Sequence, residues 1–171
     1  MLKMFYFAIS CLLPIVIHCS AWEIQPDKIQ AFLLQEETET RLQDVTCRYL
    51  DFINSIGGGE FFSHAEVAAT LLNQDCKKIF NGNLYTENRD DFVADLLSVN
   101  VNQGCWSVHA VDIIISAQKR ASILRLIIKM ETSEIFTAIV ILRFNESDLI
   151  TEINEVFNKI GNPYDFEGER T

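Results

Sequence analysis

The amino-acid sequence predicts one α+β domain in which helices come first and a mostly antiparallel sheet follows. Over the first half of the chain, apolar residues recur at steps of three and four, which is typical of helices. From residue 106 onward, runs rich in valine and isoleucine alternate with short polar stretches, which is typical of consecutive β-hairpins. Helices followed by a run of strands favour an α+β domain over a doubly wound parallel sheet.

The first predicted helix spans residues 26–53, and Pro26 suits its first turn. Residues 35–40 are polar all round, so this segment is either one long helix with a solvated stretch or two helices. Three consecutive glycines at 57–59 end it, because glycine stops helices and frees the backbone.

Two shorter helices are predicted after the glycines. The first covers residues 64–72, where Ser63 can cap the helix and Glu66 follows three residues later in a capping-box pattern. The second begins at Asn88 and carries two aspartates in its first turn, where the helix dipole favours negative charge.

Six strands are predicted around and after these helices. A short strand at 75–80 leads through the tight turn Asn81-Gly82 into a return strand at 84–86. The longer strands cover residues 106–116, 122–131, 135–144 and 149–157. Turn-prone segments separate these four strands, so we expect an antiparallel meander.

The composition excludes several classes of protein. Hydrophobic residues make up 49% of the 171 residues, and only 7 glycines and 3 prolines occur, so the chain is neither disordered nor of low complexity. Asp and Glu outnumber Lys and Arg by 24 to 14, which gives a formal net charge of −10. This acidic balance argues against a nucleic-acid partner and against docking on an anionic membrane.

Residues 1–21 are typical of a secretory signal peptide. Lys3 precedes an apolar run over residues 5–17, and the small residues Cys19 and Ala21 suit cleavage after Ala21. The alternative is a membrane anchor, but a spanning helix needs about 20 apolar residues and this run is shorter. We therefore expect export, either to a periplasm or out of the cell.

The mature chain has no other stretch that is long and apolar enough to form a stable membrane span. Residues 22–160 then form the predicted domain, and residues 161–171 form a C-terminal tail. A domain of about 150 residues buries roughly 68–70% of the surface of its unfolded chain, so a substantial core is expected.

Three cysteines remain after the leader: Cys47, Cys76 and Cys105. An exported protein could oxidise two of them, and the sequence does not choose among the three pairings. The alternative, which we favour, is that all three are small buried hydrophobic residues. No Cys-x-x-Cys pair occurs, and we expect neither a metal site nor a cofactor.

The order of these elements resembles the nuclear transport factor 2-like superfamily, which includes the SnoaL-like polyketide cyclases and the ketosteroid isomerases. The segment 79–92 is similar to the family's central strand, turn, strand and helix, and residues 149–155 are similar to its last strand. The resemblance spans about residues 29–157. It implies a curved sheet wrapped around helices as a cone, also called cystatin-like, with an apolar pocket at the mouth.

The resemblance also implies functional positions. Enzymes of the family use a carboxylate base at the end of the first short strand, but the matching position falls at or near Asn81, which cannot take a proton. The isomerases use a tyrosine of the first helix and a protonated aspartate of the sheet as an oxyanion hole, which would match Tyr49 and Asp112. Members of the family commonly dimerise through the outer face of the sheet.

The catalytic candidates are Asp112 and His109, which lie among apolar residues of one predicted strand. A carboxylate inside an apolar cone has a raised pKa, and a histidine can act as a general base. The alternative is that both are ordinary strand or surface residues. On the last strand, Glu152, Asn154 and Glu155 are the polar residues that most resemble the family's pocket linings, but alternation puts Glu155 on the face opposite to the other two. The ligand-binding candidates are Tyr49, Phe52, Asn81, Trp106, Glu152 and Asn154.

The sequence therefore predicts an exported domain that binds a small apolar or amphipathic molecule, or a protein partner, without catalysis. One alternative is an isomerase, cyclase or dehydratase that uses a pocket carboxylate or histidine. Another is an interaction module that forms a homodimer through the apolar strands at 111–115 and 135–142.

Overall fold

A computed structural model describes residues 26–59 and 63–161, which form three helices and six strands. The leader and all but the first residue of the predicted tail lie outside these residues. The helices are α1 (Pro26–Gly57), α2 (His64–Leu71) and α3 (Arg89–Gln103). The strands are β1 (Leu72–Phe80), β2 (Asn83–Thr86), β3 (Trp106–Ser116), β4 (Ala121–Met130), β5 (Ile135–Phe144) and β6 (Ile150–Gly161). The predicted order of elements and the α+β class are confirmed.

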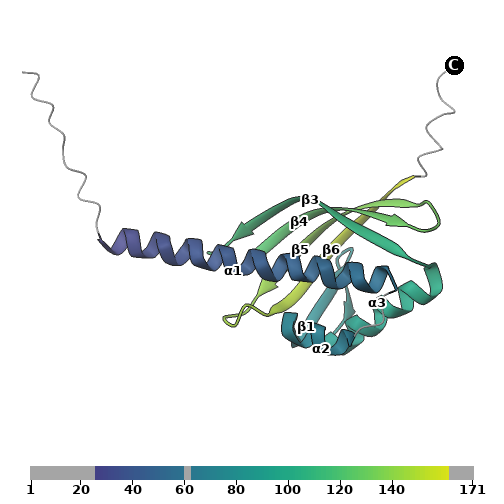
Figure 1. The fold of residues 1–171 in the computed structure, drawn as a ribbon, viewed down its shortest axis with the longest axis horizontal. Coiled ribbons are helices and arrows are strands. Elements are labelled where there is room, and N and C mark those ends of the chain that lie inside the picture. The colour runs from purple at the N-terminus through teal and green to yellow at the C-terminus, as the bar shows by residue number, and fades with distance from the viewer. Residues whose placement is uncertain (1–25, 60–62, 162–171) are drawn as a thin grey trace, which may run out of the picture.

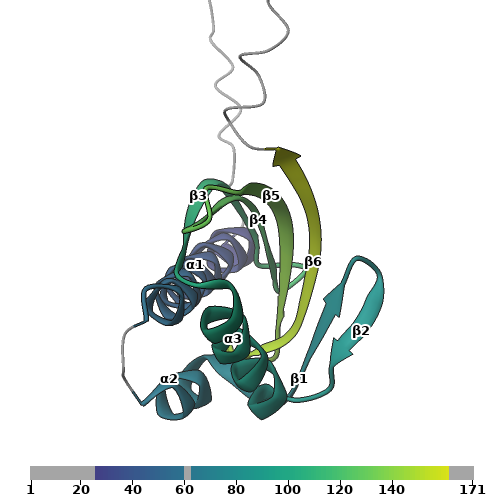
Figure 2. The ribbon, with the colours of Figure 1, turned by 90° about the vertical axis from the view of Figure 1, so that its right-hand side faces the viewer.

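The six strands form one curved sheet whose order is β2-β1-β6-β5-β4-β3. Strands β3 to β6 form the expected antiparallel meander, and β2 pairs antiparallel with β1. Strand β1 pairs in parallel with β6, which no local sequence signal predicted. Figure 2 shows the sheet curving around α1 and α3, so that the helices cover its concave face.

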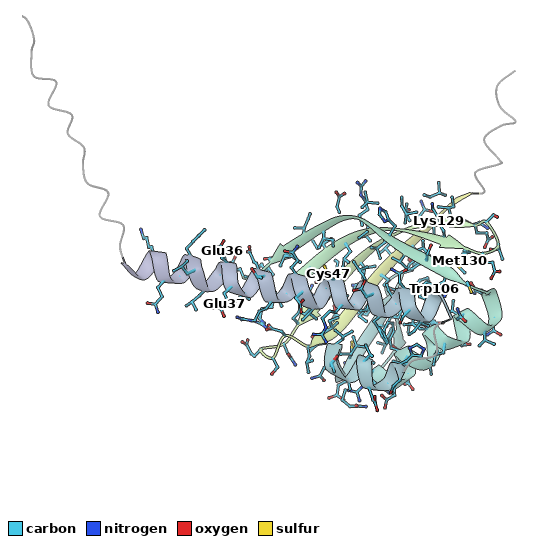
Figure 3. The ribbon with its side chains drawn as sticks, viewed as in Figure 1. Glu36, Glu37, Cys47, Trp106, Lys129 and Met130 are labelled. Atoms are coloured by element: carbon cyan, nitrogen blue, oxygen red, sulfur yellow. The ribbon has the colours of Figure 1, made fainter. Side chains whose placement is uncertain are left out.

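Helix α1 is a single helix of 32 residues, so the polar stretch at residues 35–40 lies inside one long helix and does not separate two helices. Its first part extends beyond the sheet (Figure 1), and Figure 3 shows Glu36 and Glu37 on this projecting part. Three apolar side chains there, those of Phe32, Leu33 and Leu34, are more than half exposed. None of the helices within residues 26–59 and 63–161 is both long and apolar enough to cross a membrane.

The core lies between the inner face of the sheet and the two helices that cover it. Each large aliphatic or aromatic side chain that is fully buried here contributes about 1.5–3 kcal/mol to stability. The core side chains that are less than 2% exposed include those of Leu42, Tyr49, Ile56, Phe92, Leu124, Leu126, Val140, Leu142 and Ile153. They alternate with exposed residues along β4 and β5, as a sheet with one covered face requires.

The two predicted helix caps have different outcomes. The side chain of Asn88 accepts a hydrogen bond from the Asp91 backbone N–H at 2.9 Å and caps α3. The side chain of Ser63 makes no such bond to α2, so the predicted capping box is wrong. The Ser63 carbonyl instead accepts from the backbone N–H groups of Glu66 and Val67, at 3.0 and 3.1 Å.

The three cysteines come from different parts of the fold and are all free thiols. Cys76 is buried, as expected, but Cys47 and Cys105 are exposed. The prediction that all three are buried is therefore wrong for two of them, because the helix and loop positions of these two face solvent. Burial, followed by the charge of Glu152, raises the pKa of the Cys76 thiol to about 12, so this thiol stays protonated.

Helix α1 is fastened to the edge strand β3 near its own last turn. The Asn54 side chain donates to the Val108 carbonyl at 3.0 Å and accepts from the Val108 N–H at 2.7 Å. Asn100 of α3 donates to the Gly57 carbonyl at 3.0 Å. These bonds fix the start of β3, where Trp106 packs directly against Gly57.

Candidate functional site

A cavity of about 400 Å³ lies between the helices and the concave face of the sheet. This volume falls within the range of small-molecule sites in proteins. Most of its wall is apolar and comes from strands β1, β3, β4, β5 and β6 and from both covering helices, and β2 adds the ring of Tyr85. The apolar lining residues are Ile53, Phe80, Leu96, Val99, Trp106, Val108, Leu126, Ile128, Met130, Phe136, Val140 and Phe157.

Three charged side chains form one wall of the cavity. The Nζ atom of Lys78 lies 3.1 Å from Oε2 of Glu155 and 3.6 Å from Oδ2 of Asp95. The side chains of Lys78 and Glu155 are only 8% and 9% exposed, and that of Asp95 is 17% exposed. They meet because the parallel pairing of β1 with β6 and the packing of α3 on β1 bring three distant segments together.

Aromatic residues surround the Lys78 ammonium group. Its nitrogen lies 5.9, 5.4 and 5.3 Å from the ring centroids of Phe80, Tyr85 and Phe92, within the range of cation–π attraction. The Tyr85 hydroxyl also donates a hydrogen bond to Asp95 at 3.0 Å. The ammonium group is thus held by two carboxylates and three rings, which compensates for its removal from water.

Glu155 is the least solvated carboxylate of this wall. Burial is the main cause that raises its pKa, the Lys78 charge opposes this shift, and the Asp95 charge adds to it. Its Oε2 atom is in ion-pair contact with Lys78 but has no aligned hydrogen-bond partner within the described residues. A buried carboxylate oxygen at the cavity wall therefore keeps unused capacity to accept a hydrogen bond.

Tyr49 of α1 lines the same cavity and is 1% exposed. Burial raises the pKa of its phenol well above the usual value, and the charge of Glu155 adds to this. The phenol therefore stays protonated and is able to donate a hydrogen bond to a bound molecule.

Only two of the six ligand-binding candidates line the cavity. Tyr49 and Trp106 line the cavity, and Figure 3 shows Trp106 close to its cross-strand partner Met130. Phe52 is buried in the core beside the cavity, where its ring packs edge-on against His64. Asn81 is exposed in the β1–β2 turn, and its side chain accepts from the backbone N–H of Phe157 at 3.0 Å.

The remaining candidates lie on the outer face of the sheet and do not line the cavity. Asp112 is exposed and pairs with Arg125 at 2.6 Å, and His109 is exposed on the same strand. Glu152 pairs with Arg143 at 3.2 Å, and Asn154 lies two residues further on the same face.

A β-bulge corrects the expected orientation of Asp112. Simple alternation would place it on the same face as Trp106 and Ala110. The register shifts between Ala110 and Asp112, so one extra residue in β3 turns Asp112 outward.

Of the three charged residues of the cavity wall, only Glu155 was singled out from the sequence, as one of three polar residues of the last strand that resemble the family's pocket linings. Alternation placed Glu155 on the opposite face from Glu152. Glu155 lies two residues from the apolar Ile153 and two from the apolar Phe157, and this spacing was the signal that its side chain faces inward. Lys78 and Asp95 had no comparable signal, because their proximity depends on contacts between distant segments. Within the part of the chain that the structure describes, no group of three His, Cys, Asp or Glu side chains is arranged to hold a metal ion.

The outer face of the sheet carries an exposed apolar patch of β-branched residues on four strands. Its members include one residue from each strand, namely Ile114, Ile123, Ile139 and Val156, and these four side chains are between 41% and 61% exposed. Such a patch is a feature of surfaces that meet other proteins. The homodimer expected from the family resemblance stays a prediction.

No model of a known protein family matches the sequence. No curated protein matches it either.

Solved structures do match the fold. A candidate SnoaL-like polyketide cyclase from Jannaschia sp. CCS1 superposes with a TM-score of 0.59 and 11% identity, covering 70% of this chain and 87% of its own. A cystatin-like-fold protein of unknown function from Methylobium petroleophilum PM1 superposes with a TM-score of 0.60 and 13% identity. This match covers 78% of this chain and 93% of that protein. A candidate isomerase of the SnoaL-like family from Agrobacterium tumefaciens str. C58 superposes with a TM-score of 0.54 and 8% identity. This match covers 70% of this chain and 98% of the isomerase.

These similarities define the class of fold. The chain has the α+β cone fold called nuclear transport factor 2-like or cystatin-like, and the fold implied by the predicted resemblance is confirmed. Identities of 8–13% carry no information about ligand or reaction, because this fold hosts many unrelated functions.

Proposed function

We propose that the protein binds a small apolar or amphipathic molecule in the cavity between the helices and the sheet. The observation that carries this proposal is the cavity of about 400 Å³, with apolar walls on most sides and charged residues gathered on one wall. A few convergent polar groups in an otherwise apolar pocket are the usual arrangement of a small-molecule site. We also propose that the protein acts outside the cytoplasm, on the evidence of residues 1–21.

The geometry suits a molecule with one apolar and one polar end. The apolar end would contact the side chains of β3, β4 and β5, such as Val108, Leu126 and Val140. The polar end would meet Glu155 and the phenol of Tyr49, both of which have hydrogen-bonding capacity inside the cavity.

Filling the cavity tests the proposal. Val99 lines the cavity from α3, whereas Val101 of the same helix is 83% exposed. Val99→Phe is expected to weaken binding of the neutral fluorescent probe N-phenyl-1-naphthylamine by about tenfold or more, since the ring occupies the binding volume. The matched variant Val101→Phe is expected to bind the probe like the wild type. Equal affinities of the two variants in a fluorescence titration, or no binding by the wild type, would contradict the proposal.

A second candidate function is acid–base catalysis next to a carbonyl group. The observation that favours it is a carboxylate with a raised pKa, Glu155, and a protonated phenol, Tyr49, in one apolar cavity. Two of the similar folds belong to a candidate cyclase and a candidate isomerase. A positioned general base contributes about 10²–10⁴-fold to a rate.

The second candidate predicts a measurable proton transfer. The protein is expected to accelerate deuterium exchange at the α-carbons of cyclohexanone, followed by NMR, and Glu155→Gln is expected to lose about a hundredfold of this acceleration. Exchange at the buffer rate in the wild type would favour the binding function alone.

A further inference from the structure

We propose that the cavity prefers molecules whose polar end carries a positive charge, such as an alkylamine, over molecules whose polar end is neutral or a carboxylate. This inference rests on the proposed binding function, because it concerns the ligand of the same cavity. Three observations point to it: the balance of charge on the polar wall, the remaining capacity of Glu155 to accept a hydrogen bond, and the aromatic rings beside them.

The first observation is that the polar wall holds two carboxylates and one ammonium group. Lys78 contacts both Glu155, at 3.1 Å, and Asp95, at 3.6 Å, so a single positive charge is shared between two negative charges. With both carboxylates ionised, the wall carries a net charge of about −1 in surroundings where charges interact more strongly than in water. The formal net charge of the chain, −10, adds a potential of the same sign.

The second observation is that Oε2 of Glu155, although 3.1 Å from the Lys78 nitrogen, keeps capacity to accept a further hydrogen bond. Its side chain is 9% exposed, it lines the cavity, and its Oε2 atom has no aligned hydrogen bond within the described residues. A cationic N–H group can donate to this oxygen and also neutralise the remaining negative charge, which is a strong type of hydrogen bond. A hydroxyl group can donate but brings no charge, and a carboxylate ligand can do neither.

Lys78 does not offer a competing site for an anion. Its side chain is 8% exposed, and its ammonium group already faces two carboxylates and the rings of three aromatic residues. A ligand carboxylate would have to approach Glu155 and Asp95 to reach it, and this approach is electrostatically repulsive.

The third observation is a cluster of aromatic rings that line the cavity beside the polar wall. The ring of Phe80 lies 5.9 Å from that of Tyr85 and 5.2 Å from that of Phe157, measured between centroids. The negative faces of such rings attract cations, including alkylammonium groups, and have little attraction for anions. The rings therefore favour a cationic ligand, as the carboxylates do.

The test uses three probes with the same ten-carbon chain: decylamine, which is protonated at neutral pH, 1-decanol, and decanoate. Isothermal titration calorimetry measures each against the full chain. In the wild type, decylamine is expected to bind about tenfold or more tightly than decanol, and decanoate is expected to bind most weakly. In Glu155→Gln, the advantage of decylamine over decanol is expected to fall to about threefold or less, because decylamine loses more affinity than decanol does.

A matched control distinguishes the effect of the polar wall on ligand binding from the effect of the protein's overall charge. Glu146→Gln removes the same charge from an exposed position in the β5–β6 loop, outside the cavity lining, and is expected to keep the full preference for decylamine. Asp95→Asn removes the other carboxylate of the wall and is expected to reduce the preference as well. It provides a second variant if Glu155→Gln fails to fold by circular dichroism.

Each outcome bears on the proposal in a distinct way. Decanoate binding as tightly as decylamine in the wild type overturns the charge preference and leaves the binding function intact. A preference for decylamine that survives in both wall variants also overturns it, because the preference then comes from elsewhere. Failure of all three probes and of N-phenyl-1-naphthylamine to bind overturns both this inference and the proposed function.

Discussion

Lys78→Met is expected to lower the free energy of unfolding by about 3–5 kcal/mol at neutral pH, which is the usual result of removing one partner from a buried ion pair. The methionine keeps the apolar stem of the side chain, so the loss comes mainly from the missing charge. Glu155 would then be a buried carboxylate with no cation nearby, and Asp95 would add a second negative charge to the same wall. Urea unfolding followed by circular dichroism measures the loss.

The loss in Lys78→Met is also expected to depend on pH. Burial already raises the pKa of Glu155, and without the Lys78 charge, which opposes this shift, its pKa rises further. Above the ordinary glutamate pKa, the folded variant then holds a proton that the unfolded chain has released, so stability falls as pH rises through the raised pKa of Glu155. The variant should therefore be closer to the wild type at about pH 5 than at about pH 7.5.

Two further variants separate the charge effect from a general packing defect. Lys77→Met makes the same substitution at the neighbouring exposed position of β1, and it is expected to change stability by less than about 0.5 kcal/mol. The double variant Lys78→Met/Glu155→Gln removes the unpaired carboxylate and is expected to recover about 2 kcal/mol or more. A loss in Lys78→Met that is equal at both pH values and unchanged in the double variant would rule out the electrostatic explanation.

Local patterns were sufficient to predict the order and type of the elements. The bounds of β3 and β5 agree with the sequence prediction, since period-two alternation and polar turns define both ends of each strand. Helix α1 continues through its polar stretch at residues 35–40, because exposed glutamates and threonines do not break a helix that is anchored by its buried second half.

Long-range structure explains why the site was harder to predict than the fold. Asp112 faces outward because of a bulge that adds one residue to β3, and nothing in the alternation of that strand locates the bulge. Lys78 and Glu155 meet because β1 and β6 pair in parallel, although the two residues lie far apart in the sequence. The cavity wall is therefore a product of topology, and only the inward direction of Glu155 was available from the sequence.

Gly57→Ala is expected to destabilise the protein by about 3 kcal/mol, although the same change in an ordinary helix stabilises by about 1 kcal/mol. A Cβ atom at this position would lie 2.4 Å from the carbonyl oxygen of Trp106 and 2.5 Å from an atom of its ring. The backbone of β3 cannot easily move away, because Asn54 holds the neighbouring Val108 through two hydrogen bonds and Trp106 pairs with Met130. Thermal and urea unfolding measure the change.

The same variant tests the link between the helix end and the cavity. Because Trp106 lines the cavity, a ring displaced by the new methyl group is expected to weaken binding of N-phenyl-1-naphthylamine as well as stability. Gly58→Ala is the matched control, since its Cβ would meet nothing closer than the Asn54 carbonyl oxygen at 3.3 Å, and it should change neither property by much. If Gly57→Ala were as stable as Gly58→Ala, the close approach of α1 to Trp106 would not be a constraint on this fold, and the cavity wall at Trp106 would have to be held by the Asn54–Val108 bonds alone.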